Sequence, residues 1–378
     1  MLKSEVIGNC ELEFCLVSSL SAVILGYIGR DLSLDSLIIH LSGNSTTGKS
    51  TALKLAISLF GCPDSKKQGL YGTYNSTNNA LLKKLANLNG VPYAIDEISM
   101  SSNTNFTDYI YALANGSDKE RLNKESELKE NKTWLTTILS NGERSLVGSA
   151  NKNAGIAIRV IEANNFVWTK SSENSENINK IIMKNYGHIG LKFAEYVLKL
   201  GKEKIIKEFE ERKKEMKQFL KDKDAIDSMS DRRCSKYAIL LQTAYLFQDM
   251  IDLSLNIDGI MGMLLKIEKE SIRNRNFQQS AIDYIKQYVS KYKNRFADGT
   301  NKPSDILGKI LNKNGQVEVQ MNKISFTQMI REGGFEESLV VLKELKKGGY
   351  LNCEKDRFTR TRKGDLGYNE EFYVIKLN

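Results

Sequence analysis

Apolar residues follow two different spacings along the chain, and the change of spacing divides it into regions. Between residues 37 and 170, short apolar runs alternate with amphipathic stretches, which is typical of parallel strands joined by helices. The candidate strands are 37–41, 69–74, 91–96, 134–140 and 156–161. From residue 171 to 290 the spacing is helical and charged residues are frequent. We therefore expect an α/β region followed by a helical one.

Three stretches of the helical region and one near the N-terminus have distinct patterns. Residues 203–223 are dominated by Lys and Glu, which predicts a solvated helix or a coiled arm. Further helices are expected at 231–250 and 276–295; the first has an apolar face that contains Ala238, Leu241, Ala244 and Tyr245. Residues 1–36 predict one or two lead-in helices. Serines interrupt the apolar run 14–28, which is too short for a membrane span, so we expect it to pack beside the sheet, with no membrane partner.

The C-terminal residues 301–378 follow a linker at 298–303, where one of only three prolines stands. The predicted order is helix 303–313, a strand at 317–319, helices 324–332 and 335–347, and strands 350–354 and 371–376 joined by a basic loop. This is the order of a winged helix, which binds duplex DNA through a helix and its wing. The candidate DNA contacts on the wing are Arg357, Arg360, Arg362 and Lys363. A winged helix used only for protein contacts is the alternative.

A glycine-rich loop stands between the first predicted strand and a helix from Thr51 to Phe60. Its sequence, Gly43-Asn44-Ser45-Thr46-Thr47-Gly48-Lys49-Ser50, fits the phosphate-binding pattern G-x-x-x-x-G-K-[ST]. Backbone N–H groups and the helix N-terminus would face phosphates, Lys49 would reach the β- and γ-phosphates, and Ser50 would bind Mg²⁺. A chance glycine-rich turn is the alternative, but the order of strand, loop and helix favours an ATP and Mg²⁺ site.

The strand 91–96 ends in two carboxylates, Asp96 and Glu97. Asp96 can hold Mg²⁺, and Glu97 can orient and deprotonate an attacking water. The interval of about forty residues after the glycine loop suits a neighbouring strand of one sheet. A carboxylate pair at a strand end is weak evidence alone, but beside a phosphate-binding loop it indicates hydrolysis.

Two further residues are candidates for contact with the γ-phosphate. Asn141 follows the strand 134–140 and could bind the γ-phosphate or the lytic water; an ordinary Asn-Gly turn is the alternative. Arg233 opens the helix 231–250, from which it could reach the γ-phosphate; an ordinary solvent-facing arginine is the alternative.

An arginine, Arg159, interrupts the apolar run 155–161, where a cation is costly unless it is paired. Presented from a strand or its edge, it could act on the ATP of a neighbouring subunit as an arginine finger. The alternative is a structural salt bridge to Glu162 or Asp96, and Arg144 is a second candidate for the finger.

Residues 116–130 predict a charged hairpin between the Asp96 strand and the Asn141 strand. Its basic side chains are Lys119, Arg121, Lys124 and Lys129. Inside a ring, such a hairpin would meet DNA phosphates. Acidic residues at 120, 125, 127 and 130 nearly cancel this charge, so a solvated hairpin is the alternative.

The amino-acid composition indicates which class of partner the protein binds and in which cell compartment it works. The 378 residues carry a formal net charge of +9, which favours an acidic partner such as nucleic acid, although a Lys-rich, AT-rich genome would also raise the charge. Five scattered cysteines without a C-x-x-C motif and only two histidines support neither a disulfide framework nor a zinc site. Free thiols fit a cytoplasmic location.

The order of these motifs carries a family resemblance. Gly43–Ser50 is followed by the segment 72–77, Asp96-Glu97, the hairpin, Ser140-Asn141-Gly142-Glu143, and then Arg159 and Arg233. This order resembles the AAA+ ATPase module of the MCM-like (superfamily 6) self-loading replicative helicases of mobile genetic elements, above all those of staphylococcal cassette chromosomes and pathogenicity islands. The resemblance covers about residues 10–250, and the tail is similar to the winged helix of that family.

The resemblance implies roles for individual residues. Lys49, Ser50, Asp96 and Glu97 correspond to the Walker residues, Asn141 to sensor 1, Arg159 to the finger acting in trans and Arg233 to sensor 2. The implied domains are linker helices at 1–36, an AAA+ P-loop core at 37–170, a helical lid or linker region at 171–300 and a winged helix at 301–378. Family members often carry a further N-terminal domain, so this chain is expected to be a fragment or a minimal version.

The expected function is that of an ATP-driven DNA helicase or translocase in replication of a mobile element. The resemblance implies a hexameric ring on single-stranded DNA, with double-stranded DNA and replication or regulatory proteins of the element as further partners. A DNA-tethered regulatory ATPase switch without unwinding is the alternative. A non-enzymatic DNA-binding or assembly protein is a third class, against which the intact Lys49, Asp96 and Glu97 argue.

Overall fold

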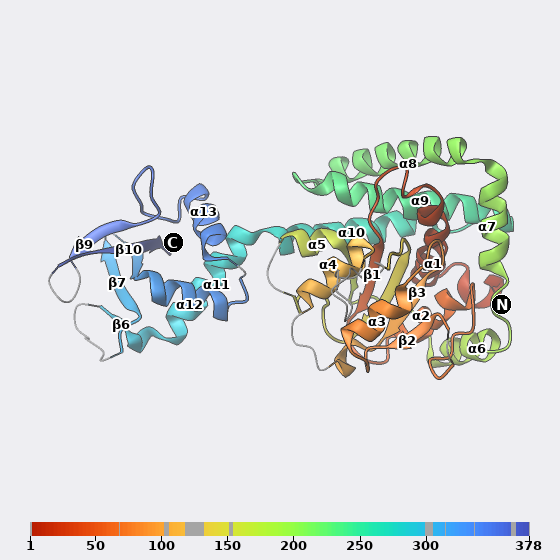
Figure 1. Ribbon diagram of the computed structural model, residues 1–378, viewed down its shortest axis with the longest axis horizontal. Helices are drawn as coiled ribbons and strands as arrows, with labels where there is room; N and C mark the ends of the chain where they lie inside the picture. Colours follow the sequence, from red (N-terminus) through yellow and green to blue (C-terminus); the bar gives the residue numbers. More distant parts are fainter. Residues whose placement is uncertain are drawn as a thin grey trace, which may run out of the picture. The chain divides into compact units, whose positions relative to one another are not determined.

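The computed structural model describes residues 2–67, 69–101, 106–117, 132–150, 154–298, 305–313, 315–335, 337–363 and 368–377. The chain forms two compact units (Figure 1). The first comprises Met1–Ala150 and Gly155–Arg273, and the second comprises Asn151–Ala154 and Asn274–Asn378. The division falls before residue 277, so a helix that the sequence assigned to the helical region belongs to the C-terminal unit.

The first unit is built on a five-stranded sheet in which all strands run parallel. Its strands are β1 (Leu37–Ser42), β2 (Tyr71–Thr73), β3 (Tyr93–Asp96), β4 (Thr137–Gly142) and β5 (Val160–Asn164), in the order β2-β3-β4-β1-β5. This confirms the predicted α/β fold. The expectation that the Asp96 strand neighbours the first strand is wrong, because β4 is inserted between them.

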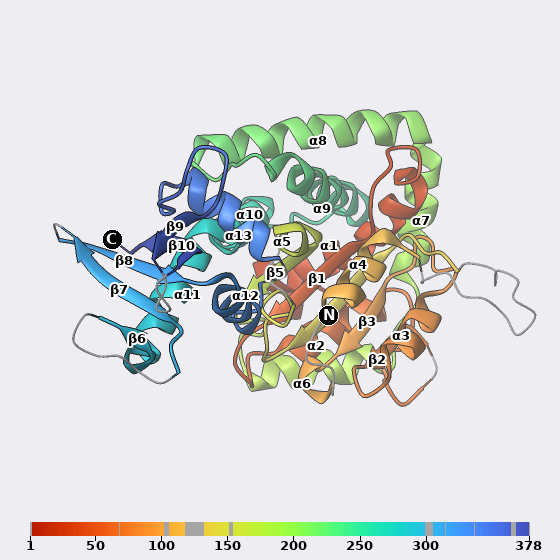
Figure 2. The ribbon, with the colours of Figure 1, turned by 60° about the vertical axis from the view of Figure 1, so that its left-hand side comes forward.

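Helices cover both faces of this sheet, and β1 is buried throughout (Figures 1 and 2). Side chains of β1 alternate between two apolar cores: Leu37, Ile39 and Leu41 face one, and Ile38 faces the other. The first core includes α1 (Cys10–Ile28) and α2 (Lys49–Ser58). The second includes α3 (Asn78–Leu85), α4 (Thr107–Asn115) and α5 (Ala154–Arg159). The remaining elements of the first unit are η1 (Leu2–Val6), η2 (Ile98–Met100), α6 (Ser172–Ile182), α7 (Ile189–Leu200), α8 (Lys202–Asp222), α9 (Ser230–Ile251) and α10 (Ile257–Arg275).

Helix α1 is the apolar N-terminal segment, and it packs on α2, α9 and β4 as expected. Among the described residues it is the one helix whose length and composition would allow a membrane span, but 83% of that span is buried inside the protein. Its serines make internal hydrogen bonds: Ser19 Oγ donates to the Ala56 carbonyl at 2.6 Å, and Ser21 Oγ lies 2.8 Å from Thr137 Oγ1. Helix α1 is therefore a core helix of the α/β unit.

Two predictions about secondary structure in the first unit need correction. The segment expected as a strand at 156–161 is the helix α5 up to Arg159, and β5 starts only at Val160. A short run of buried apolar residues has no period that separates helix from strand. For the Lys- and Glu-rich segment the helix is confirmed and the coiled arm is wrong: α8 packs along α9 (Figures 1 and 2) and buries Ile205, Phe209, Met216 and Leu220.

The second unit combines three helices with a mixed sheet. Its elements are α11 (Phe277–Lys291), η3 (Lys293–Arg295), β6 (Phe296–Ala297), β7 (Gly308–Lys313), β8 (Gln316–Met321), α12 (Lys323–Glu332), α13 (Ser338–Lys347), β9 (Arg360–Lys363) and β10 (Asn369–Lys376), and the strand order is β6-β7-β8-β10-β9. The two central helices confirm the predictions for 324–332 and 335–347 to within a few residues. Helix α11 shares its core with α12 and α13 through residues such as Ile285, Phe326 and Leu342.

Two predictions in the second unit are wrong. The described part of the expected helix 303–313 contains the strand β7, which pairs antiparallel with β8. The expected strand 350–354 is reduced to a single bridge between Leu351 and Ile375, while the basic segment 360–363 forms the paired strand β9. Strand formation here depends on a partner strand and not on the local pattern.

Candidate active site

The glycine loop joins the carboxyl end of β1 to α2, as predicted. Gly48 has φ 86° at the N-cap of α2, and a Cβ there would overlap the hydroxyl of Thr169. Gly43 has φ 137°, which also favours glycine. A main-chain hydrogen bond also fixes the loop: the Trp168 N–H donates to the Thr47 carbonyl at 2.8 Å. The concave loop is therefore a fixed feature of the fold.

Lys49 lies folded inside this loop with only 7% of its surface exposed. Its Nζ donates to the carbonyls of Gly43 at 2.9 Å and Asn44 at 2.5 Å. Burial lowers the pKa of Lys49, while the carboxylates of Glu143, Glu97 and Asp96 act in the opposite direction. The ammonium thus sits among acceptors at the position where phosphate oxygens would replace the carbonyls.

Ser50, Asp96 and Asn141 meet at the carboxyl edge of the sheet. Ser50 Oγ donates to Asp96 Oδ1 at 3.2 Å, and Asn141 Nδ2 donates to Ser50 Oγ at 3.2 Å. The hydroxyl of Tyr71 donates to the other oxygen of Asp96 at 2.6 Å and orients the carboxylate. The inserted position of β4 explains this meeting, since it places Asn141 between the loop and the strand of Asp96.

Glu97 has an unusual backbone. Its φ of 60° and ψ of 79° are left-handed values that a non-glycine residue seldom adopts. The Glu97 N–H donates to Asn141 Oδ1 at 2.7 Å, and the Ser99 N–H donates to the Glu97 carboxylate at 3.2 Å. Such a conformation is often retained at functional sites because the surrounding contacts enforce it. Asn141 thus bridges the loop residue Ser50 and the backbone of Glu97.

A pocket of about 660 Å³ opens above these residues. It is lined by the loop, by Glu97 and Glu143, and by the segment that enters α6, from Thr169 to Ser172. The sequence patterns included Glu143 in a motif but gave it no role; its carboxylate accepts a hydrogen bond from the Ser45 hydroxyl. They did not single out the start of α6, although Ser171, an N-cap residue, was a readable signal.

A second polar cluster lies inside the sheet, directly behind Asn141. His40 Nδ1 lies 2.9 Å from Ser140 Oγ, and its Nε2 lies 2.9 Å from the Arg144 carbonyl oxygen. The Tyr74 hydroxyl lies 2.8 Å from Ser140 Oγ. Burial is the main cause that lowers the pKa of His40, and the nearby carboxylate of Glu162 partly opposes it.

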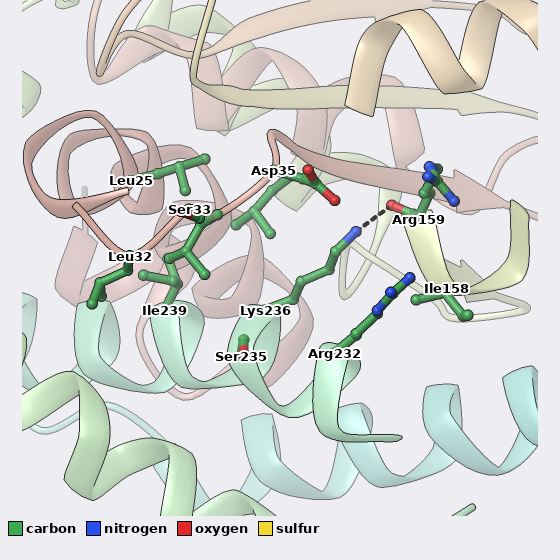
Figure 3. A pocket seen from close by; sticks show the side chains of 12 residues that line it. Leu25, Leu32, Ser33, Asp35, Ile158, Arg159, Arg232, Ser235, Lys236 and Ile239 are labelled. Atoms are coloured by element: carbon green, nitrogen blue, oxygen red, sulfur yellow. Dashed lines mark hydrogen bonds between the residues drawn. The ribbon is translucent and has the colours of Figure 1, made fainter. Parts of the chain in front are cut away.

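Arg159 ends α5 at the opposite edge of the sheet, where β1 and β5 begin. It faces a pocket of about 460 Å³ that is also lined by Asp35, Arg232 and Lys236 (Figure 3). Its Nη1 donates to the Gly155 carbonyl at 3.0 Å. Its guanidinium also lies 4.4 Å from the ring centre of Tyr111. Within the described ranges, Arg159 makes no ion pair with Glu162 or Asp96. The structural salt bridge that was the alternative for Arg159 is therefore absent from these ranges.

Lys236 supports Arg159 from the neighbouring helix α9. Figure 3 shows its Nζ reaching the Arg159 main-chain oxygen, at 2.8 Å. Burial, followed by the positive charge of Arg233, lowers the pKa of Lys236 to about 7. Arg232, one turn earlier on the same helix, is exposed and points toward Ile158. This edge of the sheet therefore presents several cations around one pocket.

Arg233 does not reach the nucleotide pocket, and it is not a solvent-facing arginine either. Its side chain is fully buried and pairs with the equally buried Glu268 at 2.8 Å. Its Nη1 donates to the carbonyls of Ala157 and Val160, and Nη2 donates to the Tyr237 hydroxyl. These hydrogen bonds all lie in the protein interior, and they connect α9 and α10 with α5 and β5.

The predicted DNA contacts are placed unevenly. Lys119, Arg121 and Lys124 lie outside the described residues. In the second unit, Arg360, Arg362 and Lys363 stand on β9, while Arg357 precedes it. Arg360 donates to Asn352 Oδ1 at 3.1 Å and Arg362 pairs with Glu318 at 3.4 Å. Arg357 and Lys363 are exposed, and the Arg357 guanidinium lies 3.8 Å from the Glu371 carboxylate.

Comparisons with known proteins agree with this arrangement. Residues 1–133 match a family described as "Domain of unknown function (DUF927)", and residues 276–378 match one described as "Cch helix turn helix domain". The solved structure described as "SCCmec type IV Cch - active helicase" is similar with a TM-score of 0.83 and 26% sequence identity. The similarity covers 100% of this chain and 68% of that one. Among curated proteins, none matches. The likeness extends over both units, so the chain is similar over its whole length to an SCCmec-type helicase, and its C-terminal residues are similar to the Cch helix-turn-helix domain.

Proposed function

We propose that this protein is an ATP-driven DNA helicase or translocase that acts in replication of a mobile genetic element, in the cytoplasm and as a hexameric ring. The observation that carries the proposal is the position of Asn141, whose side chain joins Ser50 of the glycine loop to the backbone of Glu97. Phosphate loop, metal-binding oxygens and a candidate base thereby meet beside one pocket. Such a meeting has the parts that nucleotide hydrolysis requires.

Within one subunit, the residues have separate tasks. Lys49 leaves the loop carbonyls to bind the β- and γ-phosphates of ATP, and the loop N–H groups of residues 43–51 hold the rest of the phosphate chain. The Ser50 hydroxyl and the Asp96 carboxylate are adjacent oxygen ligands that fit Mg²⁺, which needs few protein ligands beside phosphates and water. The bound ion would neutralise charge that develops on the phosphates. Glu97 accepts a proton from the attacking water, and Asn141 orients that water or the γ-phosphate.

Arg159 is assigned to the ATP of a neighbouring subunit. Along the parallel strands, its edge lies roughly 17 Å from the glycine loop of its own subunit, from five strand steps of about 3.3 Å. A finger at that distance can act only in trans, so the proposal requires an oligomer. Arg232 opens into the same pocket, and we assign to it the phosphate contact that the sequence had assigned to Arg233.

DNA is proposed to contact both units. The C-terminal unit would use α13 and the exposed Arg357 and Lys363. Lys119, Arg121 and Lys124, which lie outside the described residues, would contact the strand inside the ring. Similarity to an active helicase and to a helix-turn-helix domain supports these contacts. If ATP hydrolysis responds to DNA but no strand is displaced, a DNA-tethered ATPase switch replaces the helicase.

The test compares Glu97→Gln with Glu176→Gln, which removes another carboxylate from the wall of the same pocket. We expect Glu97→Gln to bind ATP but hydrolyse it about a hundredfold more slowly or worse, since general-base catalysis contributes about 10²–10⁴. Glu176→Gln should stay near the wild type. Unchanged turnover in Glu97→Gln would refute the assignment. Strand displacement and the mass of the assembly with ATP and single-stranded DNA test the helicase and the hexamer.

A further inference from the structure

We propose that His40 is a positioning residue for ATP hydrolysis: it holds the segment Asn141-Gly142-Glu143 at both ends and so fixes the contacts of this segment with the phosphate loop. The inference rests on the proposed ATPase function and adds a residue that does not itself touch the nucleotide pocket. The histidine lies in the middle of β1, where its side chain is fully buried.

The two contacts of the His40 ring, with Ser140 and with Arg144, are called the clamp, and their geometry follows from the sheet register. His40 is paired with Ser140 on β4, so both side chains lie on the same face, opposite to the neighbouring Asn141. One ring nitrogen contacts the Ser140 hydroxyl just before the segment, and the other contacts the Arg144 carbonyl just after it, each at 2.9 Å. A single rigid ring therefore spans the segment.

The residues between these two points make the contacts that matter for phosphate chemistry. Asn141 bonds to Ser50 and to the Glu97 backbone, and the Glu143 carboxylate accepts from Ser45. Gly142 has no room for a side chain, because a Cβ there would overlap Ile98 next to Glu97. A displacement of the segment would therefore move both the loop contacts and the candidate base.

The hydrogen bonds of the clamp have one consistent direction. A carbonyl oxygen can only accept, so the proton of the neutral ring is on Nε2 and points to Arg144. Nδ1 then accepts from the Ser140 hydroxyl, whose oxygen in turn accepts from Tyr74. The cluster stands among apolar side chains such as Ile38 and Ile138. A leucine could fill that space, but it would remove the His40 donor to the Arg144 carbonyl and the His40 acceptor of the Ser140 hydroxyl, which would keep only its contact with Tyr74.

The experiment measures ATP turnover and ATP affinity separately in the full-length protein. For His40→Leu we expect kcat to fall about tenfold to a hundredfold, because small misplacements of catalytic groups have effects of that size. The Kd for a non-hydrolysable ATP analogue should change by less than about threefold, because Lys49 and the loop are retained. His40→Gln, which can still donate to the Arg144 carbonyl, should be intermediate.

The matched control is Ser21→Ala. It removes a buried hydrogen bond to Thr137, on the same strand but away from the clamped segment, and should keep kcat. Should His40→Leu fail to fold, Ser140→Ala tests the same contact with a smaller change and should also lower kcat. Wild-type kcat in these variants, or an equal loss in Ser21→Ala, would overturn the inference while leaving the ATPase proposal intact. Absence of hydrolysis in the wild type would overturn the proposed function itself.

Discussion

The fully buried ion pair between Arg233 and Glu268 makes a sharp prediction, because sequence similarity and structure assign Arg233 different tasks. A sensor arginine affects turnover and leaves the fold intact. A buried arginine that holds elements together affects the fold first. Replacing Arg233 by alanine should therefore destabilise the first unit strongly.

The magnitude follows from what the side chain touches. Both partners have 0% exposed side chains, so alanine would remove the Arg233 guanidinium from contact with the buried Glu268 carboxylate. Breaking a buried pair in this way costs about 3–5 kcal/mol. The carbonyls of Ala157 and Val160 would also lose the hydrogen bonds from Arg233, and Ala157 would keep only the bond from the Ser271 hydroxyl at 3.3 Å. Since a whole domain is stable by only about 5–15 kcal/mol, the loss is a large fraction of its stability. It should lower Tm by about 6–20 °C.

Thermal unfolding followed by circular dichroism measures this change, with Arg232→Ala as the control. Arg232 precedes it on α9, is exposed, and should alter Tm by less than about 2 °C, as surface substitutions usually do. A double variant, Arg233→Met with Glu268→Leu, removes both charges and should regain part of the lost stability.

The opposite pattern would refute the reasoning. If Arg233→Ala kept the wild-type Tm and lost only ATP turnover, the arginine would act on nucleotide and the buried pair would not represent its role. If the double variant were less stable than the single one, loss of the Arg233 charge beside the buried Glu268 carboxylate would not be the main cost.

Three further predictions concern the loop, the subunit contact and pH. Gly48→Ala should abolish ATP binding in a nucleotide titration, because its Cβ meets Thr169 and its φ is positive; normal affinity would contradict the loop geometry. Arg159→Ala and Lys49→Ala subunits should each be inactive alone and regain ATP turnover when mixed, because Lys49→Ala supplies the arginine finger and Arg159→Ala supplies the intact loop. If the finger acted in cis, the mixture would show no turnover. The pKa of His40 is lower in the folded protein than its unfolded value of about 6.5. As pH falls below this value, the unfolded chain therefore binds a proton that the folded protein does not, and the free energy of unfolding should fall by up to about 1.4 kcal/mol per pH unit. Urea unfolding at acid and neutral pH should show this part of the loss in the wild type and not in His40→Gln.

The sequence by itself determined the features that depend on neighbours along the chain. The glycine loop needs particular residues at fixed intervals, and Gly48 and Lys49 stand where the pattern placed them. Asp96 and Glu97 end their strand as predicted, because a buried apolar run that stops at carboxylates marks the edge of a sheet. The alternation of strands and helices likewise follows from local hydrophobic spacing.

Tertiary structure decided which distant segments meet. The insertion of β4 between β1 and β3 brings Asn141 to Ser50, and no local pattern specifies that order. The segment 308–313 is a strand because β8 supplies its hydrogen-bond partners. Arg233 is buried because Glu268 and two main-chain carbonyls compensate for its desolvation, and these groups come from distant parts of the chain. The cost of burying a charge depends on its partners in space, so the residue type alone could not reveal whether this arginine faces a phosphate or the core.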